Sequence, residues 1–192
     1  MRPLHNSQAP AGAGHFMDTE QTRLRAVSPE VVYSDGNFLA VDGSTIALLK
    51  DMALAAPRRR SRLCFHADPS AAQQEMLIVM RRSSYVRPHR HHGKAETLSI
   101  VEGECDAVLF NPDGLVTDVV AMSPAAEGGS FFYRMPDGQF HTVIVKSEWL
   151  VFLETTIGPF EPTMTEAAEW APPESDAQSG HAYLSELMRL AQ

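Results

Sequence analysis

Nine consecutive residues, Pro88-His89-Arg90-His91-His92-Gly93-Lys94-Ala95-Glu96, hold the densest set of metal-binding side chains in the chain. His89 and His91 stand two positions apart, so both side chains share one face of an extended strand and can converge on one ion. Glu96 comes five positions after His91, and one straight strand would turn it to the opposite face. A bend is required, and Gly93 permits one. We therefore expect the histidines at the end of one strand and Glu96 at the start of the next.

A fourth ligand is expected from a distant strand, because ligands from one hairpin leave an ion open on its other side. His141 follows the turn Pro136-Asp137-Gly138 and begins an alternating run with Val143 and Val145. Three imidazoles and one carboxylate suit one divalent ion of Fe, Mn, Ni, Co or Zn, and the sequence does not choose among these metals. The predicted metal ligands are His89, His91, Glu96 and His141.

Short β-rich runs separated by Gly, Pro, Asp and Asn surround these residues and predict an all-β antiparallel barrel or jelly roll. The eight runs are 63–66, 76–80, 98–101, 107–110, 115–120, 131–133, 140–145 and 149–153. A helix is expected between Asp42, a good N-cap residue, and Pro57. A short C-terminal helix is expected because Tyr183, Leu184, Leu187, Met188 and Ala191 recur at helical spacing.

The length of 192 residues suits one domain with tails. We expect a tail or strap over 1–30, a helical lead-in packing on the barrel over 31–61, the barrel over 62–162, and a C-terminal segment with a short helix over 163–192. His5, His15 and His181 lie in tail-like segments and are expected to be solvated.

The net charge of −8 is unevenly distributed. Residues 58–94 hold nine Lys or Arg and two Asp or Glu, a net charge of +7, so the remainder carries −15. This balance argues against nucleic-acid binding and fits a small carboxylate or phosphate held in the basic segment. The arginine run 58–62 is read as a solvated helix exit. Two cysteines without a Cys-x-x-Cys pair, and no apolar run of membrane length, favour a cytoplasmic protein without a membrane partner.

Several other side chains are expected to lie around the histidines. Arg90 lies between two ligands, so alternation should turn it away from the ion. Cys64 and His66 are expected to pack or to support the site rather than to bind a second metal, and Cys105 to be a buried strand residue. The candidates for binding an anionic substrate are Arg81, Arg87 and Lys94, and the candidates for lining the cavity, with plain core as the alternative, are Tyr85, Tyr133 and Met135.

The two ligand segments resemble the two signature motifs of the cupin superfamily. The first, His-x-His-x4-Glu-x6-Gly, is met by His89, His91, Glu96 and Gly103; the second, Pro-x-Gly-x-x-His, ends at His141. The resemblance covers about residues 62 to 160 and implies a double-stranded β-helix, or jelly-roll, barrel in which these three histidines and Glu96 bind the metal. Ser83 and Val145 depart from the motifs, but neither position is a ligand.

A closer resemblance is to the WbuC-type cupin metalloproteins associated with bacterial surface-polysaccharide (O-antigen) gene clusters. It is carried by residues 58–66, 84–91, 94–97 and 154–160. The resemblance implies a fold, a metal and a polysaccharide context, and it names no substrate. By analogy with cupins, a homodimer is expected.

These observations favour a metal-dependent enzyme, of isomerase or dioxygenase type, acting on a small anionic metabolite such as a sugar or sugar nucleotide. The alternative is a non-catalytic sugar- or effector-binding cupin that uses the metal to anchor its ligand. Two further readings stay open: a metal with a purely structural role, and a metal-free sugar epimerase with Glu96 as its general base.

Overall fold

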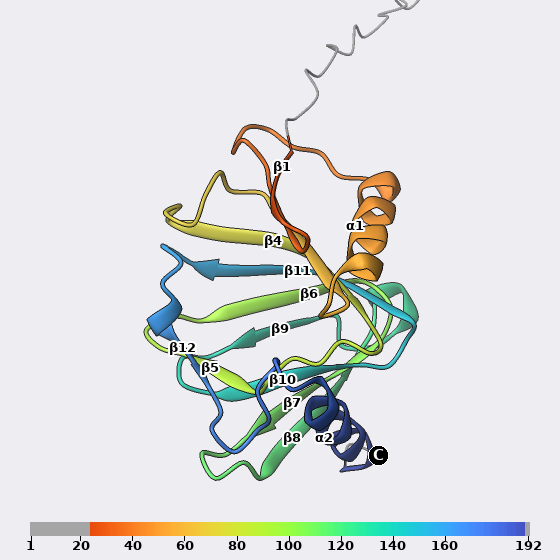
Figure 1. Cartoon of the computed structure of the whole chain (residues 1–192), viewed down its shortest axis with the longest axis vertical. Helices are drawn as coiled ribbons and strands as arrows, with labels where there is room; N and C mark the ends of the chain where they lie inside the picture. Colours follow the sequence, from red (N-terminus) through yellow and green to blue (C-terminus); the bar gives the residue numbers. More distant parts are fainter. Residues whose placement is uncertain (1–23, 191–192) are drawn as a thin grey trace, which may run out of the picture.

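The computed structural model describes residues 24–190, in which two β-sheets face each other (Figure 1). The larger sheet has the order β1-β2-β3-β4-β11-β6-β9 and the smaller one β12-β5-β10-β7-β8. The strands of the larger sheet are Arg25–Ser28 (β1), Val31–Tyr33 (β2), Arg60–Cys64 (β3), Gln73–Arg81 (β4), Trp149–Ile157 (β11), Glu96–Glu102 (β6) and Phe132–Met135 (β9). Those of the smaller sheet are Thr165–Ala167 (β12), His89–His91 (β5), Phe140–Val145 (β10), Cys105–Phe110 (β7) and Val116–Met122 (β8).

From β4 to β11 the chain crosses from one sheet to the other at every connection except the β7–β8 hairpin. All pairings are antiparallel except that of β2 with β3. This is the double-stranded β-helix of a cupin jelly roll, and it confirms the predicted all-β fold with its N- and C-terminal helices. Each of the eight predicted β runs overlaps a strand, although the run 63–66 extends two residues beyond the end of β3.

Three strands come from segments that gave no β signal: β1, β2 and β12. Each has three or four residues, too few for an alternating pattern to show. Consequently β1 and β2 extend the larger sheet from the stretch expected to be a tail and lead-in, and β12 lies beyond residue 162. The first 23 residues, with His5 and His15, lie outside the described range.

The helix α1, Gly43–Ala55, begins and ends where the sequence predicts. The Asp42 side chain accepts hydrogen bonds from the backbone N–H groups of Ser44 and Thr45, which caps the helix. Leu49 and Ala53 are buried against β3 and β4, so α1 covers the outer face of the larger sheet at that end.

The helix α2, Ala177–Leu190, is longer than predicted and packs Leu184 and Leu187 on Phe110 and Phe140 of the smaller sheet. His181 lies on this helix. Its ring is exposed, as expected, but Nε2 lies 3.1 Å from the carbonyl oxygen of Ser83.

The space between the sheets is filled with apolar side chains at one end only. This core is built from Met80, Leu98, Ile100, Cys105, Ala107, Met122, Val143, Val145, Leu150 and Phe152. Cys105 is buried, as predicted. Figure 1 shows the short strands β5 and β12 side by side. On these strands His89, His91 and Thr165 place polar side chains in the interior. The packed end therefore forms the floor for a polar interior.

Gly103 offers a test of the turn between β6 and β7. Its φ is +83°, and a Cβ there would lie 2.0 Å from the carbonyl oxygen of Trp149. Gly138 has a similar φ of +76° with nothing within 4 Å of its Cβ position. We expect Gly138→Ala to lose ~1–2 kcal/mol from left-handed strain and Gly103→Ala to lose a further ~1–3 kcal/mol from overpacking. Urea denaturation measures both, and equal losses would contradict this account.

Candidate metal centre

The four predicted ligands come together from both sheets. His89 and His91 lie on β5, His141 pairs directly opposite His89 on β10, and Glu96 is the first residue of β6. The bend expected at Gly93 is present, with a φ of +71°. One ligand atom from each of the four side chains lies within 4.8 Å of the other three, and this cluster is the group that could hold a metal ion among residues 24–190.

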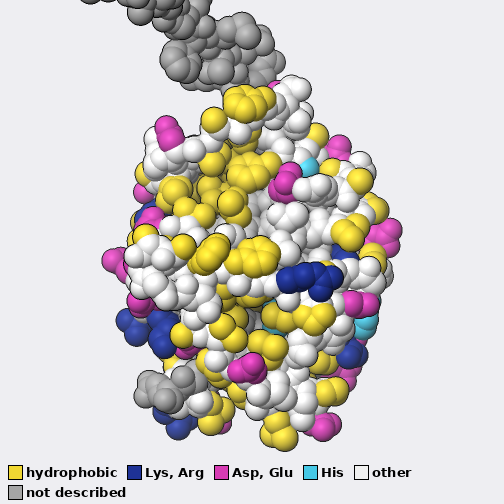
Figure 2. All heavy atoms as spheres, turned by 180° about the vertical axis from the view of Figure 1, so that it is seen from behind, with side chains coloured by type: hydrophobic (Ala, Val, Ile, Leu, Met, Phe, Trp, Pro, Cys, Tyr) yellow, Lys and Arg dark blue, Asp and Glu magenta, His cyan; other side chains and the backbone are white. Residues whose placement is uncertain are grey.

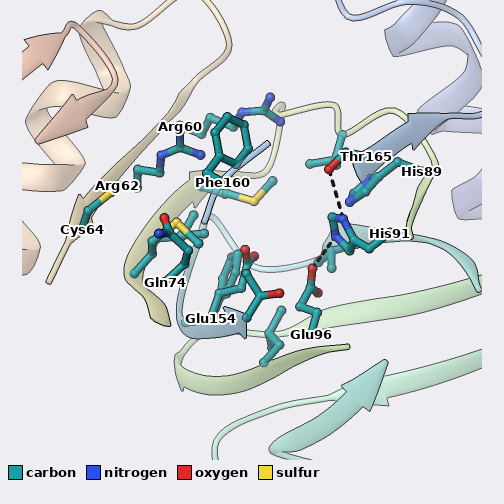
Figure 3. Close-up of a pocket in the computed structure, with 18 of the residues that line it drawn as sticks. Arg60, Arg62, Cys64, Gln74, His89, His91, Glu96, Glu154, Phe160 and Thr165 are labelled. Atoms are coloured by element: carbon teal, nitrogen blue, oxygen red, sulfur yellow. Dashed lines mark hydrogen bonds and ion pairs between the residues drawn. The ribbon is translucent and has the colours of Figure 1, made fainter. Parts of the chain in front are cut away.

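The far nitrogen of each imidazole is already engaged. Nδ1 of His89 lies 3.0 Å from the carbonyl oxygen of Arg87, and Nδ1 of His141 lies 3.0 Å from that of Gln139. Nδ1 of His91 lies 3.1 Å from the hydroxyl oxygen of Thr165 on β12 (Figure 3). A carbonyl accepts but never donates, so Nδ1 of His89 and His141 carries the proton and Nε2 presents a lone pair in the neutral ring. This is the usual support of metal-binding histidines.

Those lone pairs point toward a carboxylate. Nε2 of His91 lies 2.9 Å and Nε2 of His141 lies 3.6 Å from the two oxygens of Glu96, whose Oε1 also accepts a hydrogen bond of 2.8 Å from the Tyr133 hydroxyl. Burial raises the pKa of Glu96, but hydrogen bonds from His141 and His91 outweigh it and hold the pKa well below its ordinary value. Burial lowers the pKa of His89 to about 4.

His141 behaves differently from His89. Burial alone would lower its pKa, but its hydrogen bond and ion pair with Glu96 leave the pKa raised. Converging lone pairs and a carboxylate repel one another unless a positive charge lies between them, and a proton or a divalent ion can supply it. The N3O donor set therefore fits a divalent metal, whose identity the residues do not determine.

A cavity of about 570 Å³ opens beside this cluster. Its floor is apolar, from Met80, Leu98, Val143 and Phe152. Figure 3 shows Arg60 and Arg62 reaching in from β3, Phe160 between them and the histidines, and Glu154 near Glu96. A volume of this size accommodates a small metabolite next to the four donors.

Three of the five predicted substrate-binding residues line the cavity: Arg87, Lys94 and Tyr133. Tyr133 contacts Glu96 through its hydroxyl, and Lys94 is 5% exposed. Arg87 is less available, because its Nε and Nη2 both donate to the carbonyl oxygen of Ala168, at 2.9 and 2.6 Å.

The other two, Arg81 and Tyr85, lie away from this cavity. Met80 faces the cavity, so alternation turns Arg81 to the outside, where it lies 3.8 Å from Glu148. Tyr85 packs edge-on against Tyr183 of α2 and donates its hydroxyl to the carbonyl oxygen of Pro172 at 2.9 Å. Neither side chain lines the cavity.

Arg90 turns away from the cluster as predicted: it makes two hydrogen bonds to Glu166 of β12 and stacks over the Phe140 ring. Met135, the third residue considered for the lining, is buried and lies outside the cavity.

The arginine run is a solvated helix exit, as predicted, only at Arg58 and Arg59, which are exposed. Arg60 and Arg62 belong to β3, and their two-residue spacing brings both to the cavity. Arg60 donates to Glu174 at 2.6 Å, and Arg58 pairs with both Glu174 and Glu30. The alternating pattern through Cys64 and His66 was the available signal, because every second residue from Arg60 to His66 faces the same side.

Cys64 and His66 also line the cavity. Burial raises the pKa of the Cys64 thiol, and Nδ1 of His66 lies 3.1 Å from the backbone of Glu75. Among the described residues, no third metal-binding side chain is grouped with them.

Glu154 is the acidic residue that sequence reasoning missed. It lies on β11 between Phe152 and Thr156, which share its inward face. Burial, together with the negative charge of Glu96, raises the pKa of Glu154 to about 8. A single carboxylate on the inward face of an apolar strand was a visible signal, and it placed a titratable group in the interior.

Comparisons with known proteins give partial overlaps. Residues 41–122 match the model of a family described as a domain of unknown function (DUF6016), a stretch with three of the four donors that ends before His141. No curated protein sequence matches the chain.

Among solved structures, the chain is similar to capsular polysaccharide assembling protein CapF from Staphylococcus aureus, with 17% identity and a TM-score of 0.47, covering 59% of this chain and 33% of that one. It is also similar to a mutant of Bacillus subtilis oxalate decarboxylase, with 14% identity and a TM-score of 0.44, covering 56% of this chain and 27% of that one. The chain thus spans a third or less of these two proteins. Within residues 24–190, no helix has both the length and the apolar character to cross a bilayer.

Glu154→Gln should stabilise the metal-free protein at about pH 7.5 and flatten its pH dependence. The folded state keeps the proton of Glu154 up to a pKa of about 8, whereas the unfolded chain releases it near ~4.3. Between these values the unfolded state binds fewer protons, so stability falls as pH rises. Gln removes this loss, a gain of ~1 kcal/mol or more.

Denaturant titrations at about pH 5.5 and 7.5 measure this effect. The matched control is Glu186→Gln on the exposed face of α2. If Glu154→Gln and the original chain keep the same difference between the two pH values, the raised pKa is wrong.

Proposed function

We propose that this protein is a metal-dependent enzyme of the cupin fold that acts on a small anionic metabolite. The observation that supports it best is the convergence of three imidazoles and one carboxylate at the wall of a 570 Å³ cavity. On an octahedral ion such as Fe(II), Mn(II), Ni(II) or Co(II), four protein donors leave positions open for water or substrate, whereas on tetrahedral Zn(II) they would fill the coordination shell. The proposed ligands are His89, His91, Glu96 and His141.

A divalent ion bound there supplies Lewis acidity toward a carbonyl or hydroxyl oxygen of the substrate. Tyr133 orients Glu96 by donating a hydrogen bond to Oε1, and Thr165 positions the His91 ring. The apolar floor excludes water from the deep side of the cavity. Glu154, with a pKa of about 8, holds a proton at neutral pH that it can give to a substrate and take back.

The proposed context is bacterial surface-polysaccharide biosynthesis, with a sugar or sugar nucleotide as substrate. It is supported by the resemblance to WbuC-type cupins, whose matching segments 58–66 and 154–160 supply cavity residues as well as strands. Arg60, Arg62, Glu154 and Phe160 all lie in these two segments. The resemblance therefore extends from the donor cluster to the part of the cavity that would contact a substrate.

A homodimer in the cytoplasm remains part of the proposal. Phe132, Leu153 and Ile157 are exposed, and alternation places them on the outer face of β9 and β11. Figure 2 shows hydrophobic side chains gathered on the upper part of one face of the molecule. Such patches support association with a second copy.

Elemental analysis tests the metal. His89→Ala combined with His141→Ala should reduce the bound divalent metal from about one ion per chain to a trace, because two of four donors are lost. The matched control is His92→Ala, since His92 lies beside the cluster in sequence but pairs outward with Glu166 at 2.7 Å. Unchanged metal content in the double variant would refute the site.

Turnover separates the enzyme from a non-catalytic protein that uses the metal as a ligand anchor. Metal-loaded protein should convert at least one member of a panel of sugar phosphates, sugar nucleotides and keto acids, the last assayed with oxygen uptake. The activity should disappear in the double histidine variant and persist in His92→Ala. Tight binding of a panel member without conversion would favour the anchor.

A further inference from the structure

We infer that Arg62 and Lys94 form an anion subsite in the cavity that takes the phosphate group of a small phosphorylated metabolite, whose oxygen-bearing end reaches the four-donor cluster. This inference rests on the proposed function and names its substrate class. Of the predicted anion clamp of Arg81, Arg87 and Lys94, it keeps Lys94 and puts Arg62 in place of the two arginines.

The position of Arg62 is the first step. Arg60 and Arg62 are two residues apart on β3 and line the cavity together. In Figure 3 both guanidinium groups lie across the cavity from His89 and His91, with Phe160 between the two sides. A ligand that spans this distance would contact a cationic group at one end and the donor cluster at the other.

The second step is to ask which cationic side chains of the cavity already have a protein partner. Arg60 is neutralised by Glu174 at 2.6 Å, and Arg87 is held by the carbonyl oxygen of Ala168. Arg62 is half-buried and makes no ion pair with a described residue, and its Nε is buried without a hydrogen-bond partner. A guanidinium partly removed from water without an acidic partner loses hydration that an anionic ligand would replace.

Lys94 also lacks an acidic partner, and it is more deeply buried than Arg62. Its side chain lines the cavity, the residue is 5% exposed, and no described carboxylate lies within ion-pair distance of its ammonium group. Its ammonium group lies over the Phe160 ring, with Nζ 6.0 Å from the ring centroid. A lysine buried this deeply without an acidic partner is unusual, because its charge normally stays in water or in a salt bridge.

Glu154 connects the two cations without neutralising them. Arg62 and Lys94 both act on this carboxyl, but burial and Glu96 outweigh them and raise its pKa to about 8. No oxygen of Glu154 lies within ion-pair distance of Arg62 or Lys94, so the positive charge of both side chains remains for a ligand.

The geometry favours a phosphate over a carboxylate. The planar guanidinium of Arg62 can hold two oxygens of one phosphate, and the ammonium of Lys94 can hold a third. A phosphate monoester carries close to two negative charges at neutral pH, which matches two unpaired cations better than a single carboxylate charge does. The remaining cavity has room for a sugar-sized body against Phe160.

Calorimetric titration with inorganic phosphate tests the subsite. Arg62→Gln and Lys94→Gln should each weaken phosphate binding about tenfold or more, because each removes a charged hydrogen bond. The matched control is Arg81→Gln, which removes an arginine whose side chain lies outside the cavity and should leave the affinity unchanged. Thermal unfolding checks that each variant is folded, and Lys94→Gln carries the test if Arg62→Gln does not fold.

Two further titrations test whether phosphate binds at Arg62 and Lys94 rather than at the four-donor cluster, and whether the subsite prefers phosphate to a carboxylate. The His89→Ala/His141→Ala variant, which removes two metal donors, should bind phosphate as the original chain does, so this arm separates failure of the subsite from failure of the metal site. Acetate should compete only weakly. The inference is overturned if phosphate binding requires the two histidines, if acetate competes equally well, or if Arg81→Gln weakens binding as much as Arg62→Gln.

Discussion

The pairing of His89 with His141 across β5 and β10 is the contact on which the arrangement of the site depends. It brings the two motif segments, about fifty residues apart in sequence, into one sheet with their imidazoles side by side. The bend at Gly93 then carries the chain to the opposite sheet, so that Glu96 closes the cluster from the other side. The four donors come from both sheets and so hold the two sheets at a set distance from each other. Because polar side chains occupy this part of the space between the sheets, a cavity remains beside them.

The charge asymmetry of the sequence acquires a spatial meaning in this fold. The basic segment 58–94 does not form one patch. Arg58 and Arg90 are paired with glutamates from distant segments, at Glu30 and Glu166, which hold the N-terminal strands and β12 against the barrel. Among the cations without an ion pair, Arg62 and Lys94 line the cavity, whereas Arg59 and Arg82 are exposed. Surface ion pairs of this kind add little stability individually. Their clearest effect is that Arg58 and Arg90 are already paired with carboxylates, so these two cations are not available to a ligand.

Much of the fold and the donor set could be predicted because both depend on local patterns: alternation for β10, a cap and a proline for α1, and the spacing of His89, His91 and Glu96. The differences came from long-range contacts. The outward turn of Arg81 depends on which face of β4 meets the cavity, and Tyr85 is held by Tyr183 of α2, about one hundred residues away. Alternation along β11 could have placed Glu154 on an inward face, but its position beside Glu96 depends on the pairing of β11 with β6, which no local pattern encodes.

The central claim is that three imidazoles and one carboxylate bind a single divalent ion. X-ray absorption at the metal edge of the purified protein tests it most directly. The account predicts nitrogen and oxygen neighbours at ~2.0–2.2 Å, with the outer-shell scattering of three imidazole rings and no sulfur. A sulfur neighbour at ~2.3 Å, which would implicate Cys64, or a spectrum without imidazole scattering would contradict it.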